Sequence, residues 1–183
     1  MKAAVKISGI VCSMVLAAVL ASCSRPDTKS PEVSDSIRKS LDQAGFKDVS
    51  VSQDRDKGVV TLSGHVPADA DKAQAESIAK SMSGGQVVAN EVSVIPPGAE
   101  SDAKAVISDV DKGIEKNLDA ALIQNQMNKG IKYSVKSGVV TLTGNVNSQA
   151  RRAQVAKVAA GVPNVQQVVN ELQIKDQKAT SSN

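Results

Sequence analysis

Aromatic residues are almost absent from this 183-residue chain, which has one phenylalanine, one tyrosine and no tryptophan. Proteins that bind single-stranded nucleic acids stack bases on aromatic side chains, and the chain also lacks a dense basic stripe. We therefore expect no nucleic-acid partner. The only histidine, His65, ends a strand-like stretch and has no evident partners for catalysis or metal binding, so we expect an exposed polar position.

Cysteine is equally scarce, because the chain has only Cys12 and Cys23. Lys2 and Lys6 begin a positive segment, residues 7–20 are apolar and uncharged, and Leu-Ala-Ser-Cys follows at 20–23. This order is typical of a secretory signal peptide, and the apolar run is shorter than the roughly 20 residues that a spanning helix needs. With Cys12 removed, the mature chain would have no disulfide and no cysteine metal site.

The last four residues of that segment resemble the bacterial lipobox, in which the cysteine is lipidated and becomes the first residue. The resemblance implies a lipoprotein signal peptide at 1–22 and a lipid anchor on Cys23. Ser24 stands where an inner-membrane retention signal would have aspartate, so the resemblance also favours an outer-membrane lipoprotein that faces the periplasm.

A long segment of the chain repeats at an offset of 80 residues. Residues 58–66 read GVVTLSGHV and residues 138–146 read GVVTLTGNV, and apolar positions continue to match as far as 90–94 and 170–174. A repeat of this length fixes the architecture, since each copy must adopt the same fold.

Each copy has the pattern helix, strand, strand, helix, strand. Alternating apolar residues predict first strands near 49–51 and 131–135, and glycine-containing turns at 56–58 and 136–138 lead into β-branched second strands. An apolar stripe at 155, 158, 159 and 162 predicts a helix, which Ser148 can cap. The final strands, 87–95 and 165–174, follow a helix, which indicates parallel pairing with the second strand.

The helix before the first strand differs between the copies. In the first copy it covers 33–44, and in the second the apolar spacing runs from 102 to 126. Glycine costs about 1 kcal/mol in a helix interior, so the longer segment is either one helix or two helices separated near Gly113. Asn128-Lys129-Gly130 is typical of a helix C-terminal cap.

The sequence thus predicts an α+β fold of two tandem αββαβ sandwiches, each with two helices on a three-stranded mixed sheet. We place a tether at 23–31, a first domain at 32–95, a linker at 96–101, a second domain at 102–175 and a disordered tail at 176–183. Units of about 65 residues bury a modest fraction of their surface, so we expect them to pack together or against the extra helical segment. Thr61 and Thr141 lie on the sheet face away from the helices, which could dock a partner or the other copy.

The repeated residues resemble the BON domain family. Its pattern of Gly-x-Val-x-Leu-x-Gly, a helix and Val-x-Asn appears at 58–64 with Asn90 and at 138–144 with Asn170, and the family's Gly-Val-Pro-Asn-Val pattern appears only at 161–165. The resemblance implies a small α/β sandwich. Members with two such domains include an osmotically induced periplasmic protein and an outer-membrane lipoprotein, and the latter implies binding of anionic phospholipid and a role in envelope integrity.

The two copies differ in charge, because residues 31–97 hold 7 basic and 10 acidic side chains while residues 101–175 hold 10 and 6. A basic residue near an anionic bilayer contributes about 1 kcal/mol. The candidate lipid-contacting residues are the basic ones of the second copy, whose alternative role is a solvated surface: Lys112, Lys116, Lys129, Lys132, Arg151, Arg152 and Lys157.

The chain shows no constellation for catalysis. The glycines at 58, 64, 138 and 144 flank strands and lack the Lys-Ser/Thr of a phosphate-binding loop, and Asn90 and Asn170 are expected to satisfy backbone groups. We therefore expect no cofactor, no metal and no enzymatic activity. Two functions stay open, namely an envelope lipoprotein that binds anionic phospholipid and supports outer-membrane integrity or stress tolerance, and a periplasmic adaptor that holds another envelope protein.

Overall fold

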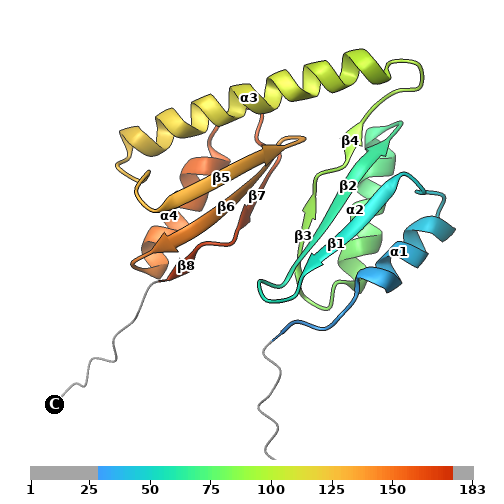
Figure 1. Ribbon diagram of the computed structural model, residues 1–183, viewed down its shortest axis with the longest axis horizontal. Coiled ribbons are helices and arrows are strands. Elements are labelled where there is room, and N and C mark those ends of the chain that lie inside the picture. Colours follow the sequence, from blue (N-terminus) through green and yellow to red (C-terminus); the bar gives the residue numbers. More distant parts are fainter. Residues whose placement is uncertain (1–28, 175–183) are drawn as a thin grey trace, which may run out of the picture.

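The computed structural model describes residues 29–174, which form two successive modules of the same design (Figure 1). The predicted signal peptide, the lipidation site Cys23 and the predicted tail lie outside these residues. The first module consists of α1 (Ser34–Gln43), β1 (Val49–Asp54), β2 (Val59–Val66), α2 (Asp69–Met82), β3 (Val87–Asn90) and β4 (Ser93–Val94). The second consists of α3 (Glu100–Gln124), β5 (Ile131–Lys136), β6 (Val139–Val146), α4 (Gln149–Ala160), β7 (Gln167–Asn170) and β8 (Gln173–Ile174).

Each module has a mixed sheet around its second strand. β2 pairs antiparallel with β1 and parallel with β3 and the short β4, and β6 pairs in the same way with β5, β7 and β8. The parallel pairing across a helix confirms the predicted crossover. The two helices of each module cover one face of its sheet (Figure 1), so the predicted fold class is confirmed.

The cores lie between helices and sheet, where the apolar spacing placed them. In the first module Ile37 and Leu41 of α1 pack against Val60 and Leu62 of β2 and Ala79 of α2. The second module repeats this core, and the stripe residues Val155 and Ala159 are fully buried there. The side chain of Ser148 caps α4 by accepting a hydrogen bond from the Arg151 backbone N–H at 3.1 Å.

The segment that could have been one helix or two is a single helix of 25 residues, α3, with Gly113 inside it. The predicted cap at Asn128-Lys129-Gly130 was wrong. The helix ends at Gln124, and the chain turns at Gln126, whose φ is 55°. This turn lets the Met127 N–H donate to the Leu122 carbonyl at 2.7 Å and buries the Met127 side chain, while Gly130 belongs to the approach to β5.

The final strand of each module is shorter than predicted and is interrupted. In the first module the break falls at residues 91 and 92, because the Asn90 side chain enters the strand. Its Oδ1 accepts from the Val92 N–H at 3.4 Å and its Nδ2 donates to the Lys72 carbonyl at 3.2 Å. Asn170 makes the corresponding bonds in the second module. The two asparagines thus satisfy backbone groups, as expected, and fasten the last strand to the preceding helix.

The modules differ at the first hairpin. Residues 55–58 connect β1 to β2, whereas Ser137 and Gly138 alone connect β5 to β6, with φ angles of 48° and 76°. Two positive φ values are typical of the type I′ turn that tight hairpins favour. Ser30 and Pro31, which the sequence placed in the tether, already bond to the first hairpin, since the Ser30 N–H donates to the Arg55 carbonyl and Gln53 to that of Pro31.

Candidate functional site

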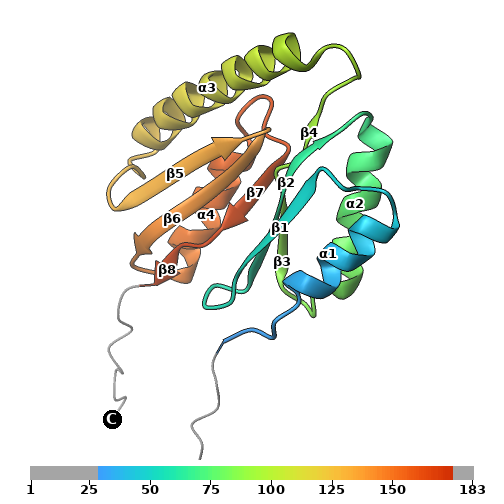
Figure 2. The same cartoon turned by 45° about the vertical axis from the view of Figure 1, so that its right-hand side comes forward.

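The two modules pack together through the sheet faces that carry no helices, with β3 and β7 side by side (Figure 2). Their apolar contact consists of Val59 and Ala89 from the first module and Val139 and Val169 from the second, all at most 5% exposed. The two pairs occupy equivalent positions in the repeat, so the same patch meets itself, as in the interface of a twofold dimer. Of the two occupants expected for this face, a partner or the other copy, the structure shows the other copy.

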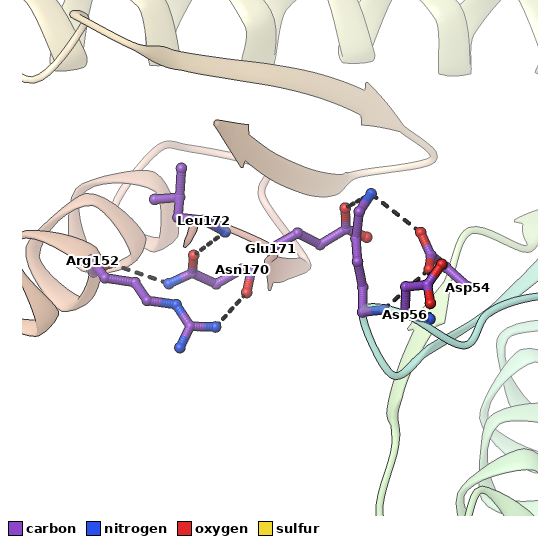
Figure 3. A network of polar contacts seen from close by, with 7 residues as sticks. Asp54, Asp56, Arg152, Asn170, Glu171 and Leu172 are labelled. Carbon is purple, nitrogen blue, oxygen red and sulfur yellow. Dashed lines mark hydrogen bonds and ion pairs between the residues drawn. The ribbon is translucent and has the colours of Figure 1, made fainter. Parts of the chain in front are cut away.

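Two ion pairs cross the interface with the same approximate symmetry. Lys57 Nζ lies 2.7 Å from Glu171 (Figure 3). Lys136 Nζ lies 3.2 Å from Glu91, the equivalent glutamate. Lys57 also lies 3.3 Å from Asp54. The hydrogen bond to Glu171 raises the pKa of the Lys57 ammonium above its usual value despite the opposing effect of burial. These contacts fix how the modules face each other.

One contact across the interface breaks the symmetry. The side-chain amide of Gln167 on β7 bonds to the backbone of β3, with Nε2 donating to the Val88 carbonyl at 2.6 Å and Oε1 accepting from the Asn90 N–H at 3.0 Å. The equivalent residue of the first module is Val87, which has no polar atom to return the contact and is about half exposed. The edge of β3 is therefore covered by an amide from the other module.

A groove of about 490 Å³ opens at one end of this interface. It is lined by both modules, so it exists only when they are docked. The first module contributes β4 and the start of α2, and the second contributes the N-terminal half of α3 and the loop before β7. Its apolar wall is formed by Val92, Val94, Val106, Ile107, Val110 and Val165.

The polar wall of the groove is held by contacts between the elements. Asp111 of α3 accepts from the backbone N–H groups of Ser137 and Gly138 at 2.8 and 2.9 Å, which ties the helix to the β5–β6 turn. The hydroxyls of Ser137 and Ser93 then meet at 2.7 Å across the modules. Both carboxylate oxygens of Asp111 therefore accept hydrogen bonds from the backbone, and this side chain stabilises the wall of the groove.

Lys72 is the one basic residue of this lining. Its ammonium donates to Gln166 Oε1 at 2.9 Å and forms no ion pair with a carboxylate of residues 29–174. Burial lowers the pKa of Lys72 below its usual value, and the nearby carboxylates of Asp69, Glu76 and Asp111 oppose that shift. The groove therefore carries charges of both signs.

A second hollow, of about 380 Å³, lies at the opposite end of the second module, and we call it the basic end. It is lined by Lys129, Arg151, Ile131, Val146 and the amides of Gln126, Asn145 and Asn147, without an acidic residue. The Arg151 guanidinium donates to the Gln126 carbonyl. Lys129 and Arg151 are two of the seven candidate lipid-contacting residues, and both line this hollow.

The other candidate lipid-contacting residues are spread over different faces. Lys112 and Lys116 are exposed on α3, Lys157 lines a separate hollow between α3 and α4, and Lys132 lies on β5 with its side chain exposed. Arg152 is engaged inside the fold, because its Nη2 donates to the Asn170 carbonyl at 2.9 Å (Figure 3). The seven residues therefore do not form one patch.

No group of three or more histidine, cysteine or acidic residues is placed to hold a metal ion within residues 29–174. No helix among these residues combines the length and the apolar character that crossing a membrane requires. His65 is exposed at the end of β2.

Sequence reasoning missed the groove. It depends on how two modules face each other, which a repeat does not encode. One feature of the sequence pointed to it. The apolar spacing of α3 includes Ile107 and Val110, which precede Ile114, the first residue of this helix in the core of the second module. Val106 and Val110 are 63% and 40% exposed, so this half of the helix shows an apolar face to the groove.

The chain belongs to the BON domain family. The family model matches residues 30–96 and 110–176, which together cover most of the chain. Osmotically-inducible protein Y of Escherichia coli (strain K12) is 30% identical over 137 residues, which span 74% of this chain and 67% of that protein.

Two solved structures are also similar, both of CdsD, a structural protein of the type III secretion system of Chlamydia trachomatis. Each is 16% identical, with a TM-score of 0.34; the first covers 76% of this chain and 96% of the CdsD chain, the second 75% and 90%.

Proposed function

We propose that the protein is a non-enzymatic lipoprotein of the cell envelope, anchored by acyl chains on Cys23 to the periplasmic side of the outer membrane. Its second module binds anionic phospholipid and helps to maintain the membrane barrier under osmotic stress. The signal and lipobox in the sequence support the anchor, and the osmotic induction in the name of the Escherichia coli relative supports the stress role.

The basic end of the second module carries the lipid part of this proposal. Lys129 and Arg151 line one hollow with apolar Ile131 and Val146, which suits a phosphate headgroup above the start of an acyl chain. At the equivalent positions the first module has Lys47 and Asp71, so its charge is balanced there. The exposed lysines of α3 and α4 add to the positive field of the same module.

Vesicle flotation of unlipidated residues 24–183 tests the proposal. We expect recovery with phosphatidylglycerol vesicles, little recovery with phosphatidylcholine vesicles, and weakening by added salt, because charged contacts are screened. The double variant Lys129→Gln/Arg151→Gln should lose most of the recovery. The matched variant Lys39→Gln/Lys47→Gln removes the same charge from the first module and should keep it. Equal recovery with both vesicle types would remove lipid binding from the proposal.

A periplasmic protein–protein adaptor is the second candidate function. The groove between the modules favours it, because residues of both modules line it and it holds charges of both signs. Co-elution of the tethered protein with an envelope protein in a fixed stoichiometry, lost when the groove is altered, would support this function over the first.

A further inference from the structure

The segment that precedes α1 is fastened to the first hairpin, residues 55–58, which connects β1 to β2. The Ser30 N–H donates to the Arg55 carbonyl at 2.9 Å, and Arg55 Nε donates back to the Ser30 carbonyl at 2.7 Å. The carbonyl of Pro31 accepts from Gln53 Nε2 at 2.7 Å and from Gln86 Nε2 at 3.1 Å. The chain therefore enters the folded part of the molecule beside this hairpin.

The proposed lipidation site is close to this hairpin along the chain. Cys23 lies seven residues before Ser30 in the sequence. A chain extends by at most about 3.6 Å per residue, so this tether bridges at most about 25 Å. Acyl chains on Cys23 would therefore hold the first hairpin within that distance of the bilayer. Which other parts of the protein can touch the same bilayer depends on where they lie relative to the hairpin.

The basic end lies at the same end of the molecule as the first hairpin. Lys57 of the hairpin pairs with Glu171, which follows β7, whereas β3 begins beside the hairpin, so β3 and β7 run in opposite directions. Two residues beyond Glu171, Gln173 of β8 pairs with Asn145, which lines the basic end. The start of the described chain and β8 accordingly lie on the same, lower side of the molecule in Figures 1 and 2.

The groove lies at the opposite end, and so does the first module's counterpart of the basic end. The β5–β6 turn contributes to the groove, and β6, which separates this turn from the basic end, has eight residues and spans about 26 Å. In the first module, Lys47 and His65 hold the positions equivalent to Lys129 and Asn145. Both lie at the ends of β1 and β2 that are remote from the first hairpin, and both are exposed.

We propose that the basic end binds anionic headgroups of the same leaflet that holds the acyl chains of Cys23. The protein is then attached at two points of one end and presents the groove away from the bilayer. This inference rests on the anchor and the lipid binding of the proposed function, and it adds the leaflet and the orientation. The short tether strengthens the second contact, because it keeps the basic end at a high effective concentration near the headgroups.

The thiol of Cys23 allows a direct test, because it is the only thiol of residues 23–183. This chain is coupled through Cys23 to maleimide-bearing phosphatidylethanolamine in phosphatidylcholine vesicles, with a fraction of phosphatidylglycerol too low to float the uncoupled chain. Acetylation of single lysines, followed by mass spectrometry, reports which end faces the bilayer. We expect Lys129 to react at least about tenfold more slowly than on vesicles without phosphatidylglycerol, whereas Lys47 should react at the same rate on both.

Coupling at the opposite end provides the matched control. The variant Cys23→Ser/His65→Cys moves the thiol to the first module's counterpart of the basic end, and Lys129 should then react at its unprotected rate. Arg151→Gln in the chain coupled through Cys23 should also restore that rate, because one of the two cations is lost. Equal protection of Lys129 from both attachment points, protection of Lys47 in its place, or no protection from Cys23 would each overturn the proposal. Flotation of the uncoupled chain shows separately whether lipid binding fails with it.

Discussion

Gly64 and Gly144 hold equivalent positions, and each has a backbone conformation that only glycine adopts easily, with φ of 111° and 116°. A Cβ at Gly144 would lie 2.2 Å from the Gly130 carbonyl oxygen, which is backbone and cannot move aside. We expect Gly144→Ala to lower the free energy of unfolding by at least about 2 kcal/mol. Urea denaturation measures the change.

Gly113 offers the matched control for this substitution. It lies inside α3, and a Cβ there would meet nothing within 4 Å. Gly113→Ala should therefore raise the free energy of unfolding by about 0.5–1 kcal/mol, because alanine loses less conformational freedom in a helix. If both alanines lowered stability alike, the close backbone approach at Gly144 would not explain its glycine.

Among the elements, α3 depends on a single side chain for its link to the β5–β6 turn. Asp111 accepts both N–H groups of that turn, whereas Asp109 is exposed and pairs with Lys112 of the same helix. We expect Asp111→Ala to speed amide hydrogen exchange in residues 100–110 of α3, because their half of the helix packs on no core of its own.

Residues 114–124 should keep their slow exchange in that variant, since Ile114, Leu118 and Leu122 anchor them in the core. Asp109→Ala should leave both halves unchanged, as an exposed ion pair contributes little. Uniform acceleration along the helix would show that Asp111 supports the whole module and not the extension alone.

Elements whose cause is local could be predicted from the sequence. Alternating apolar residues gave β1 and β5, β-branched residues gave β2 and β6, and the buried stripe gave α4, because each pattern matches one secondary structure. Three features depend on tertiary contacts and escaped prediction. The continuity of α3 through Gly113, the turn at Gln126 that buries Met127, and the strand breaks at Asn90 and Asn170 are each decided by packing or by bonds to a distant helix.

The candidate sites divide in the same way. Lys129 and Arg151 were identifiable as basic residues of the second copy, but only the fold brings them to one hollow. The fold also decides that Arg152 bonds to the Asn170 carbonyl inside the module. The groove was not predictable, because it brings together residues that are distant in the sequence. Asp111 and Ser137, for example, are 26 positions apart.

At the scale of the whole molecule, the groove exists only when the modules dock. Gln167 contributes the interface contact that has no equivalent in the other module. Replacing Gln167 by valine, the residue at the equivalent position of the first module, would leave the Val88 carbonyl and the Asn90 N–H without their partner. We expect Gln167→Val to speed hydrogen exchange at the Asn90 N–H by about fivefold, since a lost hydrogen bond contributes roughly 1 kcal/mol.

The neighbouring Glu91 N–H provides an internal reference, because it donates to the Leu62 carbonyl within the first module at 2.9 Å. Its exchange should not change when only the docking is weakened. Both amides exchanging faster would mean that the first module itself had been destabilised, and an unchanged Asn90 would mean that Gln167 does not cover this edge in solution. The reverse substitution, Val87→Gln, places an amide against the β7 edge and should slow exchange at the Asn170 N–H, because the two modules meet through equivalent faces.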